Sequence, residues 1–118
     1  DTHGHWVGDE VLRRVAKIIQ KQLRNIDITG RYGGEEFSVI LTDTDIERGM
    51  KVAQRMRVEV QNKIIGEAAP VSCTISLGLA AFDRSMPNID DWIKAADSAL
   101  YDAKKQGRNR CCVFTGHS

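Results

Sequence analysis

Three segments of the chain carry apolar residues at the three- and four-residue spacing that is typical of an amphipathic helix. The spacing predicts helices over residues 8–24 and 46–63, and a third that starts at Ile89 and ends before Gly107, which can cap it. Asp9 and Glu10 are expected in the first turn of the first helix, where acidic side chains favour the helix dipole. The apolar positions are Leu12, Ala16, Ile19 and Leu23 in the first stripe, which Val11, Val15 and Ile18 widen, Met50, Ala53, Met56, Val60 and Ile64 in the second, and Ile89, Trp92, Ile93, Ala96, Leu100 and Ala103 in the third.

Alternating apolar positions predict strands between these helices. Residues 26–31 and the segment in which Phe37, Val39 and Leu41 share one face form a predicted β-hairpin, with two glycines at its tip. Residues 71–81 alternate between an apolar side and a side of small residues, so a neighbouring element is expected to approach one face closely. A last strand is expected at 110–114.

The order of these elements predicts one α/β (α+β) domain in which helices pack on a mostly antiparallel sheet. The length of 118 residues suits a single domain. A chain that opens on a helix would ordinarily have a strand leading into that helix, as in a split βαβ unit. The pattern therefore predicts a sheet from which one strand is missing.

Composition narrows the functional classes. Lys and Arg total 17 against 16 for Asp and Glu, a net charge of +1, so bulk electrostatics do not favour a nucleic-acid polymer as partner. The three cysteines fit no zinc-site spacing, which suits a reducing, cytoplasmic setting. No apolar run approaches the roughly 20 residues of a membrane-spanning helix.

The hairpin tip carries the most informative chemistry. Gly33 and Gly34 let a phosphate or nucleotide approach the backbone closely, and the carboxylates of Glu35 and Glu36 are oxygen ligands of the kind that Mg²⁺ prefers. Successive strand residues point to opposite faces, so Glu35, nearer the tip, is the favoured metal ligand. A plain hairpin with solvated acidic residues explains the same spacing.

Two further pairs of charged residues stand out. Lys104 and Arg108 are four residues apart, which would place them on one helical face; a solvated basic face is the commoner explanation of such a pair. Arg24 and Asp27 have the spacing RxxD, for which an exposed ion pair at a helix end is sufficient.

Several motifs in order resemble the GGDEF family of diguanylate cyclases, here in its Gly-Gly-Glu-Glu-Phe form. Residues 4–9 are similar to that family's Gly-His-x-x-Gly-Asp turn, and residues 31–37 to its signature hairpin. Residues 74–78 resemble its Thr-x-Ser-x-Gly strand, and residues 96–109 resemble its closing helix with the Gly-Arg-Asn that follows. The resemblance covers nearly the whole chain.

The resemblance implies a nucleotide-cyclase, palm-like sheet with a ferredoxin-like βαββαβ core whose first strand is missing. It implies a homodimer in which two GTP molecules condense to cyclic di-GMP and pyrophosphate with Mg²⁺ or Mn²⁺. By position, the implied metal ligands and catalytic residues are Glu35 and Glu36, and the implied substrate-binding residues are Asp9 at the guanine edge, Gly33 and Gly34 at the tip, and Lys104 and Arg108 at the β and γ phosphates.

The resemblance also implies inhibition by the product. Arg24 and Asp27 lie where that family's inhibitory site binds cyclic di-GMP, and Arg55 matches a further arginine that clamps the same ligand. A guanidinium suits both phosphate pairing and stacking on a base.

The chain departs from the family at its start. The family's first strand, with an Asp-x-Asp-x-Phe-Lys stretch and a following Asn, has no counterpart in residues 1–118, which are therefore expected to be the C-terminal part of a GGDEF domain. An upstream sensory domain is expected in the parent protein. The chain itself is expected in the cytoplasm, where it could be the output domain of a larger or membrane-anchored protein. The 118 residues alone are expected to have little cyclase activity and to favour strand exchange.

Two other functional classes compete with the enzyme. A degenerate member of the family could act as a receptor for GTP or cyclic di-GMP. An RNA-binding sheet of similar topology is disfavoured by the charge balance and by the lack of clustered aromatic residues.

Overall fold

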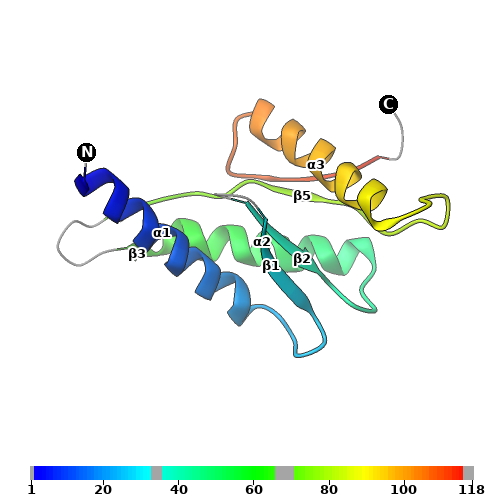
Figure 1. Ribbon diagram of the computed structural model, residues 1–118, viewed down its shortest axis with the longest axis horizontal. Helices are drawn as coiled ribbons and strands as arrows, with labels where there is room; N and C mark the ends of the chain where they lie inside the picture. The colour runs from blue at the N-terminus through cyan, green and yellow to red at the C-terminus, as the bar shows by residue number, and fades with distance from the viewer. Residues whose placement is uncertain (1, 33–35, 66–70, 116–118) are drawn as a thin grey trace.

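Helices and short strands alternate along the chain in the computed structural model (Figure 1), which describes residues 2–32, 36–65 and 71–115. Side chains are described for residues 10–30, 36–63 and 73–115. The elements are α1 (Thr2–Lys21), β1 (Ile28–Tyr32), β2 (Glu36–Ile40), α2 (Ile46–Asn62), β3 (Ile64–Ile65), β4 (Val71–Ser72), β5 (Leu77–Leu79), α3 (Ile89–Lys105) and β6 (Cys111–Val113). The predicted α+β class is confirmed, and no helix of the described part has the length and apolar character that crossing a membrane requires.

Helix α1 begins earlier than the pattern of apolar residues predicts. It starts at Thr2, so residues 4–9 belong to the helix, and the expectation that they form a turn is wrong. A glycine inside a helix costs only about 1 kcal/mol, which neighbouring turns can offset. Asp9 therefore lies beyond the first turn, which contains no acidic residue, and the helix dipole does not explain its position.

Helix α2 supplies the centre of the core. Asp45 caps its N-terminus by accepting a hydrogen bond from the backbone N–H of Arg48, at 2.8 Å. Its buried face and that of α1 form one apolar cluster, whose buried members are Val15, Ile18, Ile19, Met56 and Val60. Phe37 and Val39 of β2, Leu77 of β5, and Cys73 and Ile75 between β4 and β5 pack against it. The predicted stripes of the first two helices are therefore confirmed in outline.

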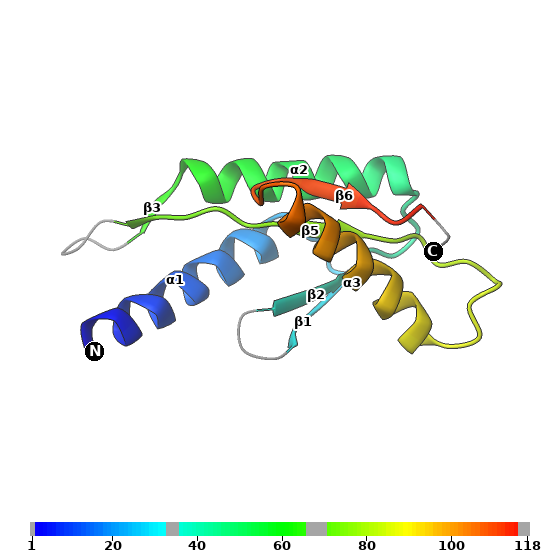
Figure 2. The same cartoon turned by 90° about the horizontal axis from the view of Figure 1, so that it is seen from above.

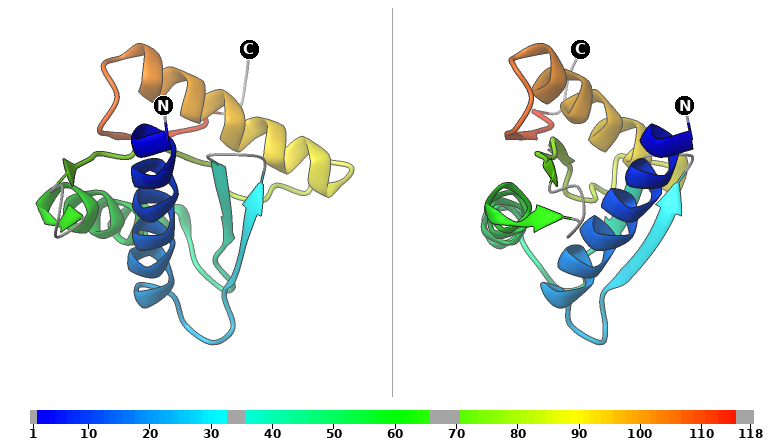
Figure 3. Two further views of the ribbon diagram at one scale, coloured as in Figure 1. Left: turned by 60° about the vertical axis from the view of Figure 1, so that its left-hand side comes forward. Right: turned by 90° about the vertical axis from the view of Figure 1, so that its left-hand side faces the viewer.

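The predicted hairpin is confirmed. Strands β1 and β2 pair antiparallel from Ile28 opposite Ile40 to Tyr32 opposite Glu36, so residues 33–35 connect them. The hairpin runs beside α1 (Figure 3). Phe37 and Val39 of β2 pack against the core cluster. Glu36 is consequently the first residue of β2 and lies next to the tip.

The strand predicted over residues 71–81 is divided in two. Its first part is β4, which pairs with β3, and its last part is β5, which pairs in parallel with β6; residues 73–76 join no ladder. The described strands form three separate two-stranded sheets, two antiparallel and one parallel, instead of one continuous sheet. A strand needs a hydrogen-bonding neighbour, and no described strand provides one between β2 and β5.

Strands β5 and β6 lie between α2 and α3 (Figure 2), and both helices contact both strands. The backbone of β5 approaches α3 very closely at Gly78, where an added Cβ would lie 2.3 Å from the carbonyl oxygen of Ala96 and 2.2 Å from the backbone nitrogen of Leu100. The prediction of one tightly approached face is confirmed.

The face that α3 buries is made of alanines. Ala95, Ala99 and Ala103 are buried, whereas Ile89 of the predicted stripe is 53% exposed. The approach at Gly78 leaves no room for larger side chains on the contacting face, so the larger residues flank it. Trp92 anchors the start of the helix by donating its indole N–H to the carbonyl oxygen of Ala80, at 2.7 Å.

Candidate functional site

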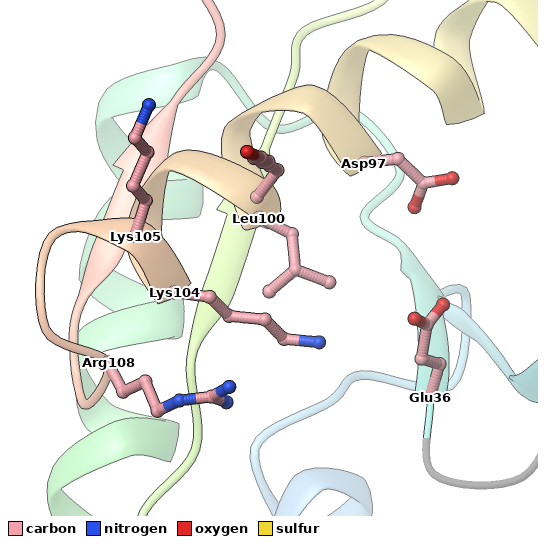
Figure 4. A pocket seen from close by; sticks show the side chains of 7 residues that line it. Glu36, Asp97, Leu100, Lys104, Lys105 and Arg108 are labelled. Atoms are coloured by element: carbon pink, nitrogen blue, oxygen red, sulfur yellow. The ribbon is translucent and has the colours of Figure 1, made fainter.

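An open pocket of about 590 Å³ lies between the hairpin and the C-terminal end of α3. One wall is Glu36 at the start of β2; the other is formed by α3 and the loop after it. Figure 4 shows Lys104 and Arg108 extending in the direction of Glu36, with Asp97 on the same helix as Lys104. The remaining lining residues are Leu100, Tyr101 and Lys105.

The end of α3 sets the position of the two cations. Gln106 is the C-cap, and Gly107 follows with φ +126°. The backbone N–H of Arg108 donates to the carbonyl oxygen of Ala103 at 2.9 Å, and that of Gly107 donates to the carbonyl oxygen of Lys104 at 3.4 Å. This pair of bonds is a Schellman motif. The expectation that Lys104 and Arg108 share a helical face is wrong, because the helix ends between them, yet both line the pocket.

The charges of the pocket are divided between its walls. The C-terminal end of a helix carries a partial negative charge, which Lys104 and Lys105 offset from the last turn of α3. The ammonium group of Lys105 lies 5.9 Å from the centre of the Tyr101 ring and points away from Glu36 in Figure 4. Lys104 and Arg108 are thus the cations turned toward the pocket, opposite the carboxylate of Glu36.

Other predicted site residues are not tested by the described geometry. Gly33, Gly34 and Glu35 lie outside the described residues, and so does the side chain of Asp9, whose backbone is part of α1. Within the described part of the chain, no three or more His, Cys, Asp or Glu side chains are grouped so that they could hold a metal ion. Glu36 is the described carboxylate beside the hairpin tip.

The pocket includes one carboxylate that the sequence analysis did not single out. Asp97 lies two helical turns before Lys104, so the seven-residue spacing of the pair was the signal that could have found it. Tyr101, between them on the same helix, also lines the pocket and is 57% exposed.

The RxxD pair lies elsewhere and forms a clamp between the end of α1 and the loop after β2. Nη2 of Arg24 is 3.0 Å from Oδ1 of Asp27, and Nε is 3.2 Å from Oδ2. The guanidinium also donates to the carbonyl oxygen of Thr42 and, at 2.8 Å, to the hydroxyl of Thr44. The Asp27 side chain is only 2% exposed and Arg24 is 50% exposed, so the clamp is more than a solvated ion pair.

We expect Asp27→Asn to remove an acid-sensitive contribution to stability. The side-chain hydrogen bond from Arg24, followed by that from its backbone N–H, lowers the pKa of Asp27 to about 2. A carboxyl whose pKa is lower in the folded state stabilises the fold above its unfolded pKa of about 3.9 and loses that effect as the pH falls toward its folded value. In urea unfolding, Asp27→Asn should therefore have a lower free energy of unfolding than the wild type at neutral pH. The difference should become smaller below a pH of about 4.

Asp102→Asn is the matched control for that experiment, since Asp102 is exposed on α3, is not part of the clamp, and the change in net charge is identical. An equal loss of unfolding free energy in both variants would contradict the role assigned to Asp27. So would a loss in Asp27→Asn that does not depend on pH.

Arg55, the third residue of the predicted inhibitory site, is exposed on α2. It lines a second hollow, of about 530 Å³, together with Met50, Lys51 and Gln54. Neither member of the Arg24–Asp27 clamp lines this hollow, so the structure does not bring the three residues together.

Comparison with known proteins gives the site a context. The family model described as diguanylate cyclase, GGDEF domain, matches residues 1–110. Diguanylate cyclase A of Treponema denticola is 43% identical over 111 residues, which are 93% of this chain and 30% of that protein. The chain therefore spans less than a third of the length of that curated relative.

Solved structures agree with the family model. The active GGEEF domain of a diguanylate cyclase from Vibrio cholerae aligns with a TM-score of 0.86 and 32% identity, over 94% of this chain and 70% of that one. The GGDEF domain of DgcB from Caulobacter crescentus, solved in complex with c-di-GMP, aligns with a TM-score of 0.89 and 31% identity, over 97% and 68%. These likenesses confirm the palm-like α+β fold that the motifs implied.

Proposed function

Because the chain belongs to the GGDEF family of diguanylate cyclase domains, we propose that it binds GTP and serves, as a homodimer, in the condensation of two GTP molecules to cyclic di-GMP. In each of two equivalent steps, the 3′-hydroxyl of one GTP attacks the α-phosphate of the other. A phosphodiester bond forms, the bond to the β-phosphate breaks, and pyrophosphate leaves with its electron pair.

The observation that carries the proposal is the placement of Lys104 and Arg108 opposite Glu36 in one open pocket. A triphosphate needs cations that reach its outer phosphates, and a guanidinium can bind two phosphate oxygens at once. Lys104 and Arg108 supply these contacts from the end of α3. Glu36 would then face the α-phosphate, where bonds change.

The carboxylates at the tip suit Mg²⁺ or Mn²⁺. Mg²⁺ in nucleotide sites is usually bound by one or two carboxylates, with substrate phosphates and water completing the shell. Glu35 and Glu36 would hold the ion, which when bound neutralises charge on the phosphates and favours attack by the 3′-hydroxyl. Asp9 of α1 is assigned to the N–H donors of the guanine edge, because a carboxylate accepts from both of them.

We also propose how the activity is regulated and where in the cell the protein acts. Cyclic di-GMP is proposed to inhibit by binding at two separate places, the Arg24–Asp27 clamp and Arg55, supported by the half-exposed guanidinium of Arg24 and the exposed position of Arg55 on α2. Residues 1–118 are proposed to form part of a larger GGDEF domain, controlled by a sensory domain and located in the cytoplasm.

The test is incubation of the chain with GTP and Mg²⁺, with products separated by chromatography against a cyclic di-GMP standard and GTP binding measured by isothermal titration. We expect binding, with little turnover by these 118 residues alone, because two carboxylates at the tip suit one metal ion better than the pair used in many phosphoryl transfers. Rapid product formation would contradict the expected low activity.

Binding without turnover, even when the family's first strand is added, would favour the receptor over the enzyme. A folded sample that binds no GTP would overturn the proposal as a whole.

A further inference from the structure

The loop that carries Arg108 has an unusual backbone. Three successive residues have positive φ, 126° at Gly107, 63° at Arg108 and 48° at Asn109. Glycine adopts such angles freely and asparagine tolerates them, but an arginine there raises the free energy of the backbone. Such a conformation persists only where surrounding contacts hold it, and it often occurs at functional sites.

Both ends of the loop are held by backbone bonds. On the α3 side, the N–H of Arg108 donates to the carbonyl oxygen of Ala103 at 2.9 Å. On the β6 side, the N–H of Leu77 donates to the carbonyl oxygen of Arg110 at 3.0 Å. The residue between these anchors, Asn109, is held in a different way.

Asn109 is fixed from two other elements. Its backbone N–H donates to Oγ of Ser76, just before β5, at 3.2 Å. Its side-chain Oδ1 accepts a hydrogen bond from Nη1 of Arg57, on α2, at 3.1 Å. Arg57 and Asn109 are 52 residues apart in the sequence, so this contact is made only in the folded chain.

Arg57 is itself held in place by neutral partners. Its Nε donates to Oε1 of Gln54 at 2.8 Å, and its Nη1 lies 3.3 Å from Oε1 of Gln61. The ion pairs found among the described residues, Arg24–Asp27 and Lys63–Glu59, do not include Arg57. The described hydrogen-bond partners of Arg57 are thus all amide oxygens, so direction-dependent hydrogen bonds hold its guanidinium in place.

We propose that Asn109, held by Arg57 and Ser76, is a positioning residue that keeps the backbone of Arg108 in the left-handed region, so that the guanidinium faces the pocket. This inference rests on the proposed function, in which Arg108 binds the outer phosphates of GTP. If Asn109 released the loop, Arg108 would return to an ordinary backbone conformation and its side chain would leave in another direction. The contact acts on the phosphates through Arg108 and does not itself touch the nucleotide.

The experiment compares the affinity for GTP with that for GMP, at fixed Mg²⁺ and ionic strength, in the wild type, Asn109→Ala and Asn109→Asp. GMP lacks the two phosphates assigned to Lys104 and Arg108, so it reports on the rest of the site. Asn109→Ala should reduce the preference for GTP about tenfold and leave the affinity for GMP unchanged. A tenfold change is what the loss of one charge-assisted hydrogen bond is expected to cause. Asn109→Asp should stay within about twofold of the wild type, because it keeps the acceptor for Arg57 and tolerates positive φ.

Three results would overturn the inference: an unchanged preference in Asn109→Ala, an equal loss for GTP and GMP, or no rescue by aspartate. If Asn109→Ala does not fold, Arg57→Met removes the same hydrogen bond and keeps the apolar stem of the side chain; an unchanged preference there would also overturn it. A wild type that does not prefer GTP to GMP would instead refute the proposed function, on which the inference depends.

Discussion

Replacing Gly78 with alanine is expected to destabilise the protein by about 3 kcal/mol or more, which is at the upper end of the range for overpacking. The new Cβ would lie 2.2 Å from the backbone nitrogen of Leu100 and 2.7 Å from its Cα. These atoms belong to the backbone of α3 and cannot move aside as a flexible side chain could. Helix α3 would have to shift from β5, and its end carries Lys104. Urea unfolding followed by far-ultraviolet circular dichroism measures the effect.

Two other glycines are matched controls. An added Cβ at Gly30, in β1, meets nothing within 4 Å, so Gly30→Ala should change stability by less than about 0.5 kcal/mol. At Gly49, in α2, the nearest atoms are side-chain carbons of Leu79 at 3.7 Å and Leu41 at 3.8 Å. Gly49→Ala should stabilise by about 0.5–1 kcal/mol, because alanine loses less entropy in a helix. Similar stability in all three variants would contradict the close approach at Gly78.

Reversing the charge of Lys104 is expected to weaken GTP binding roughly 100-fold. Lys104→Glu removes a charged hydrogen-bond donor, usually worth about 1.5–3 kcal/mol, and places a second carboxylate opposite Glu36. Each 1.4 kcal/mol corresponds to about tenfold in affinity. Titration calorimetry with GTP measures the change, and the loss should be smaller at high salt, since the pocket is open to solvent.

Lys94→Glu is the matched control for this change. Lys94 is also exposed on α3 but does not line the pocket, and the substitution alters net charge by the same amount. An equal loss of affinity in both variants would mean that the effect comes from overall charge. An unchanged affinity for GTP in Lys104→Glu would contradict the proposal that Lys104 binds the phosphates.

Much of the fold follows from local pattern. The stripes of α1 and α2, the hairpin and the small-residue face at Gly78 could all be predicted, because each depends on residues close in sequence. The separation of β4 from β5 could not, because ladder pairing depends on which strand lies alongside. Of the buried alanines of α3, Ala103 was in the predicted stripe, but Ala95 and Ala99 were missed, since hydrophobicity alone favours larger residues such as Ile89.

The site was predictable in residue type and less so in geometry. Lys104 and Arg108 were found from their motif, but regular helical spacing placed them on one face, whereas the turn at Gly107 separates them. Arg57 gave no signal at all, because its partner Asn109 is distant in sequence. Asp9, Gly33, Gly34 and Glu35 were assigned to the site from the resemblance to the family. Their local spacing alone is equally consistent with a plain hairpin or a solvated acidic residue.

The two walls of the pocket belong to different parts of the architecture. Glu36 stands on the β1–β2 hairpin, whereas Lys104 and Arg108 stand on the unit formed by β5, α3 and β6, and among the described strands no backbone ladder joins the two. A nucleotide that contacts both walls would therefore act as a brace between them. Binding would then raise the free energy needed for the hairpin to open locally. The stability of the domain would therefore increase with nucleotide concentration.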